Sequence, residues 1–127
     1  MKEFSEIYIH APHWEDIVEL KRREFLRNEN SLSLEDISIE VHNATWCPDC
    51  EREITGLMAL ILLSAEKPIL KIYSYENREE YRSKKLSGLL STECLPTIIF
   101  KKNEVEITRV LEDSKGRLLE LLNSLAD

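Results

Sequence analysis

Apolar residues along the chain follow two spacings, one typical of strands and one typical of helices. Short apolar runs predict strands over residues 7–9, 37–43, 68–75, 97–100 and 105–110. Apolar residues three and four positions apart predict helices over residues 14–27, 48–65 and 118–125, and a polar segment at 77–90 predicts a shorter helix. Strands that alternate with helices in this way indicate an α/β chain, with a mixed sheet and helices on both faces.

The connections predict how neighbouring strands pair. A helix joins the strands at 37–43 and 68–75, so we expect these two strands to be parallel. The four residues 101–104 join the last two strands and predict a hairpin. Asp113 or Ser114 is expected to cap the last helix. Gly56 lies in the middle of the helix at 48–65, where glycine costs about 1 kcal/mol relative to alanine and can permit a bend.

The length of 127 residues predicts one domain, in which residues 1–36 form an N-terminal strand and helix extension to a core at 37–127. We expect the helix at 14–27 to cover one face of the sheet, and a partner-docking arm is the alternative. This question stays open at the level of sequence.

Composition and charge exclude several classes of function. The net charge of -7 argues against general binding to nucleic acid, which needs a basic surface. The first residues lack the apolar centre of a signal peptide, and no apolar run is long enough to cross a membrane. We therefore expect no membrane partner and a cytoplasmic location. Three cysteines in a reducing compartment fit a reactive pair and one extra thiol better than a framework of structural disulfides.

Cys47 and Cys50 carry the most informative chemistry, because they stand where a predicted strand passes into a predicted helix. A thiol at a helix N-terminus is favoured as thiolate by the unpaired N–H groups and the positive end of the helix dipole. Cys50, one turn inside the helix, can then attack a mixed disulfide and release the substrate. Pro48 suits the first helical turn, where its missing N–H costs nothing.

Trp46 directly before this pair, together with the segment Leu95, Pro96 and Thr97, resembles the thioredoxin family. The resemblance covers residues 37–127 and implies a thioredoxin fold with a cis proline at Pro96, packed beside the two cysteines. It further implies a protein-disulfide reductase that acts in cell redox homeostasis without a bound cofactor. Trp46 and the segment at 95–97 would then contact the substrate, and backbone groups beside Pro96 would pair with an incoming peptide.

Two positions qualify the resemblance. The family usually has a buried acid six residues before the first cysteine, but this chain has Val41 there, and Glu40 is expected to face the other side of its strand. The route by which Cys50 loses its proton is therefore open. The family also has a lysine beneath the cysteine pair, a role that Lys71 can fill by lowering the pKa of a cysteine. The alternative for Lys71 is a strand-end lysine that reaches water.

Asp49 lies between the two cysteines and predicts the direction of the reaction. A carboxylate at this position makes a thiolate less favourable and so stabilises the disulfide, and Glu51 and Glu53 add negative charge nearby. We therefore predict a reductant, with a redox potential nearer to about -270 mV than to about -120 mV.

Cys94 is expected on the rim beside the pair, where it is either an extra redox thiol or a passive small residue. Zinc is disfavoured, because Cys47, Cys50, Cys94 and His42 lack the spacing of a zinc site, and His10 and His13 are expected to bind no metal. Glutathione dependence is disfavoured by the absence of a glycine pair after Pro96.

We expect a monomer whose partners are disulfide-containing proteins, recharged by a thioredoxin reductase or another donor. The second functional hypothesis is a binding or redox-sensing module with little catalytic turnover.

Overall fold

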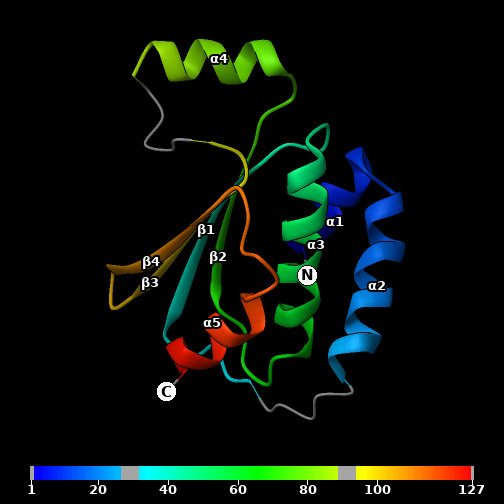
Figure 1. Ribbon diagram of the computed structural model, residues 1–127, viewed down its shortest axis with the longest axis vertical. Helices are drawn as coiled ribbons and strands as arrows, with labels where there is room; N and C mark the ends of the chain where they lie inside the picture. The colour runs from blue at the N-terminus through cyan, green and yellow to red at the C-terminus, as the bar shows by residue number, and fades with distance from the viewer. Residues whose placement is uncertain (1, 27–31, 89–93, 127) are drawn as a thin grey trace.

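A mixed sheet of four strands in the order β2-β1-β3-β4 forms the centre of the computed structural model (Figure 1). The structure describes residues 2–26, 32–88 and 94–126. Its strands are β1 (Ile37–Asn43), β2 (Ile69–Ser74), β3 (Thr97–Lys102) and β4 (Val105–Leu111). β1 pairs in parallel with β2 and antiparallel with β3, and β3 pairs antiparallel with β4. The predicted parallel pair and the predicted hairpin are both confirmed.

The described helices are α1 (Lys2–His10), α2 (His13–Leu26), α3 (Pro48–Leu63), α4 (Arg78–Leu86) and α5 (Leu118–Ala126). The helices predicted at 14–27, 48–65, 77–90 and 118–125 correspond to α2, α3, α4 and α5. Positions 27, 89 and 90 of the predicted ranges lie outside the described residues.

The strand predicted at residues 7–9 is wrong, because these residues belong to α1. Phe4 and Ile7, three positions apart, are both buried in the core, whereas 74% of the surface of Ile9 is exposed. Burial thus follows the helical period and not the alternation that the pair Ile7 and Ile9 seemed to indicate. A run of three apolar residues is too short to distinguish the two periods.

The hydrophobic core lies between the sheet and one layer of helices. Side chains from α1, α2, α3 and α5 join those of the inner sheet face in a single cluster, which includes Trp14, Ile39, Ile54, Phe100 and Leu122. α2 packs along α3, and the Lys21 ammonium donates to the Arg52 carbonyl at 2.7 Å and to the Thr55 hydroxyl at 2.8 Å. The predicted covering helix therefore covers α3 and not the sheet itself.

The mixed sheet with flanking helices confirms the predicted fold class, but the helices are distributed less evenly than predicted. Figure 1 shows α4 beyond the end of the sheet, and none of its nine residues is buried. Tyr81 of α4 packs edge-on against Tyr75, with 5.3 Å between the ring centroids. In the described part of the chain, the outward face of the sheet therefore presents side chains of the strands themselves.

Two turns differ from the sequence prediction. The hairpin turn consists of Asn103 and Glu104 alone, both with positive φ, because β3 and β4 extend up to them. Farther along the hairpin, the register shifts between Phe100 and Lys101, which marks a β-bulge. The cap predicted for the last helix is wrong. Asp113 accepts from the Lys115 N–H in a turn before α5, and the Ser114 hydroxyl donates to Glu53.

Replacement of Gly56 by alanine is expected to raise the free energy of unfolding by about 0.5–1 kcal/mol, because alanine has the higher helix propensity. A methyl group at this position would lie 3.5 Å from Leu118 Cδ1, an ordinary contact. Urea unfolding followed by circular dichroism measures the change. Gly116→Ala is the matched control and is expected to destabilise the fold, because Gly116 has a φ of +74°. A destabilised Gly56→Ala protein would contradict the prediction.

Candidate active site

Cys47 is the N-cap residue directly before α3, with an extended backbone at a φ of -100° and a ψ of 117°. Its carbonyl accepts the Glu51 N–H at 3.1 Å, and Pro48 fills the first helical turn as predicted. The Cys47 side chain is half-buried and makes no capping hydrogen bond to the N–H groups of the helix.

Cys50 is fully buried one turn farther along α3, and its sulfur accepts the Ala44 N–H at 3.4 Å. Burial raises the pKa of the Cys50 thiol. The Ala44 N–H acts in the opposite direction, whereas a hydrogen bond to Cys47 and the charge of Asp49 raise the pKa further. The raised pKa keeps Cys50 as a thiol at neutral pH.

The segment directly before β3, Leu95 and Pro96, contacts Cys47. The peptide bond between Leu95 and Pro96 is cis, as the resemblance implied. The Cys47 Sγ lies 3.9 Å from the Leu95 carbonyl oxygen, so this loop and the start of α3 are in contact. The structure thus brings together two segments that are about 50 residues apart in sequence.

Trp46, directly before Cys47, is held by contacts with Tyr75 and Arg78. Its indole N–H donates to the Tyr75 carbonyl at 3.0 Å, and the Arg78 guanidinium lies 5.4 Å from the centre of its rings. Tyr75 in turn donates its backbone N–H to the Asn43 carbonyl at the end of β1. Trp46 is half-buried and packs against the core, and its role in shielding the cysteines stays a prediction.

Arg52 organises the charges around the start of α3, a role that the sequence analysis missed. Its guanidinium pairs with Asp49 at 2.9 Å and with Glu53 at 2.9 Å. Glu53 is 3% exposed, so the carboxylate expected near the pair lies in the interior, against the Arg52 guanidinium. The spacing of Asp49 and Arg52, three positions apart in a predicted helix, was the available signal.

Comparisons with known proteins show the fold. No protein-family model matches the sequence, and no curated protein matches it either. The structure is similar to thioredoxin f2 from Chlamydomonas reinhardtii, with 18% identity over 71% of this chain and 79% of that one and a TM-score of 0.52. It is also similar to the oxidised thioredoxin from Plasmodium falciparum, with 17% identity over 75% of this chain and 86% of that one and a TM-score of 0.50. The chain has the thioredoxin fold. At this level of identity the comparison establishes the architecture, and the chemistry has to be argued from the side chains.

Lys71 is the predicted site residue that the thioredoxin fold does not bring to the cysteines. In β2, Leu70 and Ile72 are half-buried toward the core, and Lys71 between them is exposed on the outward face. It is in register with Glu40 of β1, which also faces outward, as predicted. The structure agrees with the second interpretation of Lys71, a lysine that reaches water.

His42 is buried on the outward side of β1, where its ring nitrogens contact Glu40 and the Tyr75 hydroxyl, each at 2.9 Å. The sequence analysis treated His42 only as a weak metal candidate. Among residues 2–26, 32–88 and 94–126, no three His, Cys, Asp or Glu side chains gather as a metal site. His13 pairs with Glu51 at 3.1 Å.

Cys94 and Thr97 lie on either side of the cis proline in this thioredoxin fold. The Thr97 hydroxyl donates to the Cys94 carbonyl at 2.6 Å, and the Cys94 sulfur lies 4.0 Å from the same hydroxyl. Thr97 is fully buried and Leu95 is 9% exposed, so these two residues present little surface in this structure. Cys94 is half-buried on the same loop, and its redox role stays a prediction.

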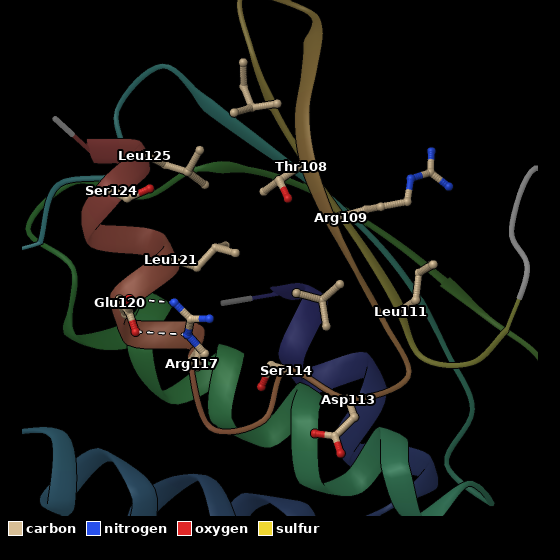
Figure 2. A pocket seen from close by; sticks show the side chains of 12 residues that line it. Thr108, Arg109, Leu111, Asp113, Ser114, Arg117, Glu120, Leu121, Ser124 and Leu125 are labelled. Carbon is tan, nitrogen blue, oxygen red and sulfur yellow. Dashed lines mark hydrogen bonds and ion pairs between the residues drawn. The ribbon is translucent and has the colours of Figure 1, made fainter.

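A cavity of about 430 Å³ lies between β4 and α5 (Figure 2). Neither cysteine of the pair lines it, and Figure 2 shows two of its charged residues, Arg117 and Glu120, paired with each other. In the described part of the chain, every helix is too short or too polar to span a membrane.

Alkylation is expected to distinguish the two thiols. Iodoacetamide at pH 7 should modify Cys47 at least about tenfold faster than Cys50, because Cys50 is buried and burial raises its pKa, so the thiolate that reacts is scarce there. Peptide mass spectrometry of the reduced protein at several times gives the two rates. The Cys50 rate should rise only above the usual thiol pKa of about 8.5. Equal rates at pH 7 would show that Cys50 is accessible and ionised.

Proposed function

We propose that the chain is a thiol–disulfide oxidoreductase that reduces disulfides in other proteins through Cys47 and Cys50. The observation that carries this proposal is the arrangement of the two thiols. Cys47 is half-buried at a helix N-terminus, and Cys50 is buried close to it, one turn farther along the helix. A pair in which one sulfur is accessible and the other is held behind it suits sequential exchange reactions.

In the first step, the Cys47 thiolate attacks one sulfur of the substrate disulfide. The substrate S–S bond breaks, a mixed disulfide forms between Cys47 and the substrate, and the other substrate sulfur leaves as a thiolate that takes up a proton. The N–H groups at the start of α3 and the Cys50 thiol support the attacking charge.

In the second step, Cys50 attacks the Cys47 sulfur of the mixed disulfide. The Cys47–Cys50 disulfide forms, and the second substrate sulfur departs with the proton that Cys50 gives up. Val41 stands where the thioredoxin family usually has a buried acid, so no carboxylate at that position is available as the base. We infer that the departing substrate thiolate takes the Cys50 proton directly. Two electrons and two protons pass to the substrate over the two steps.

The surface around Cys47 supports a protein substrate in extended conformation. The Leu95 carbonyl lies 3.9 Å from the Cys47 sulfur, so a peptide that pairs with the backbone at Leu95, Pro96 and Thr97 would present its disulfide to that sulfur. Trp46 would contact the same substrate. We further propose a cytoplasmic monomer, recharged by a thioredoxin reductase or another thiol donor, because thiol pairs of this kind work in reducing compartments.

The activity is tested by insulin reduction with dithiothreitol as the donor. Cys47→Ser is expected to lower the rate to background, because the attacking sulfur is lost. Cys50→Ser should also abolish turnover, but it should retain the substrate as a mixed disulfide that non-reducing electrophoresis detects. Cys94→Ser is the control that removes a thiol outside the pair, and it is expected to keep at least about half of the rate.

Wild-type protein with no rate above background would overturn the reductase proposal. That result would favour the second hypothesis, a binding or redox-sensing module. The buried Cys50 and the valine at position 41 give this hypothesis its support, because both slow the loss of the Cys50 proton.

The redox potential of the pair is expected nearer to about -270 mV than to about -120 mV, since Asp49 disfavours thiolate and burial holds Cys50 neutral. Equilibration with defined ratios of reduced and oxidised glutathione, followed by alkylation of the remaining thiols, gives the value. A potential well above that of glutathione would identify an oxidant in place of a reductant.

A further inference from the structure

Arg52 connects four acceptor groups from two parts of the chain. Its Nη1 donates to Asp49 at 2.9 Å and its Nε to Glu53 at 2.9 Å. Its Nη2 donates to the Glu112 carbonyl at 3.2 Å and lies 3.7 Å from the Asp113 carboxylate. Arg52 is thereby held in one place, although 47% of its side chain is exposed.

Two of these contacts concern the cysteine pair directly. Asp49 lies between the two cysteines, and its charge is one of the causes that raise the pKa of Cys50. A guanidinium 2.9 Å from that carboxylate partly cancels the negative potential at both sulfurs. The Cys47–Cys50 pair therefore experiences the sum of the two charges and not Asp49 alone.

The other contacts explain why Arg52 stays at Asp49. Glu53 is 3% exposed and also accepts from Ser114, so it is a fixed anion beneath the guanidinium. Glu112 donates its N–H to the Pro96 carbonyl at 2.8 Å, which joins the segment bound by Arg52 to the cis-proline loop. An exposed ion pair usually contributes little to stability. In this network, however, Glu53 is buried, and several of the contacts of Arg52 are directional hydrogen bonds to charged groups.

We propose that Arg52 is a positioning residue of the cysteine pair, one that sets how strongly the Asp49 carboxylate favours the disulfide over the dithiol. This inference deepens the proposed function and rests on it. The relevant reaction is the exchange of the Cys47–Cys50 dithiol with oxidised glutathione, which yields the protein disulfide and two molecules of reduced glutathione. Its equilibrium constant is measurable even in a protein that does not turn over a substrate.

The experiment compares this equilibrium constant for the wild-type protein, Arg52→Gln, Asp49→Asn and the double variant. Arg52→Gln leaves Asp49 unpaired and is expected to shift the constant about threefold toward the protein disulfide, which corresponds to about 14 mV. Asp49→Asn removes the carboxylate that faces the pair while Arg52 keeps its contact with Glu53, and it is expected to shift the constant about threefold in the opposite direction. The double variant should return to within about a factor of 1.5 of wild type, and 1 M salt should reduce both single shifts.

Arg117→Gln is the matched control, because it removes an equal charge from a pair with Glu120 that lies outside the cysteine site. It is expected to leave the constant unchanged. Arg52→Lys keeps the charge and should recover at least half of the shift seen in Arg52→Gln.

An Arg52→Gln constant equal to that of Arg117→Gln would contradict the proposal, as would a double variant that keeps the shift of either single variant. Asp49→Asn keeps the contact between Arg52 and Glu53, so it tests the charge effect even where Arg52→Gln fails to fold. An Asp49→Asn protein with the wild-type constant would also overturn the proposal. Failure of the proposed reductase function would appear in the insulin assay and leave these constants unaffected.

Discussion

The burial of Cys50 at the joint between β1 and α3 is the constraint on which the site depends. Its sulfur occupies the interior and accepts a backbone N–H from Ala44, immediately after the strand. The apolar face of α3 that continues through Ile54 and Leu57 holds this end of the helix against the sheet. Because Cys50 is fixed in the interior, Cys47, one helix turn earlier, lies at the edge of the core. The two thiols therefore differ in exposure.

Local patterns predicted the parts of the structure that adjacent residues determine. The alternation in residues 37–43 predicted β1, and the helical spacing together with Pro48 predicted where α3 begins. The contact between Pro96 and the cysteines could not follow from spacing, and it came from the resemblance to the thioredoxin family. The cis bond before Pro96 and the distance of 3.9 Å between the Cys47 sulfur and the Leu95 carbonyl oxygen agree with that step.

The incorrect predictions have physical causes. Of the two interpretations of Lys71, the lysine that reaches water holds, because Leu70 and Ile72 on either side of it point to the core and alternation sends Lys71 outward. The strand at 7–9 failed because three residues do not define a period. The contacts of Arg52 with the Glu112 carbonyl and Asp113 join segments about 60 residues apart, and no local pattern carries such information. α4 lies beyond the sheet, where its Tyr81 packs against Tyr75, a contact that its otherwise polar sequence does not indicate.

The bulge between Phe100 and Lys101 affects how the molecule behaves in a crowded solution. β4 is an edge strand, and its Val105 and Ile107 are more than half exposed, which by itself would invite another chain to extend the sheet. The irregular register twists this edge, and the bidentate pair of Arg109 and Glu106 places charge along it. Both features are ones by which β-proteins avoid aggregation. A chain that exposes apolar residues on an open edge is thereby protected from polymerising through it.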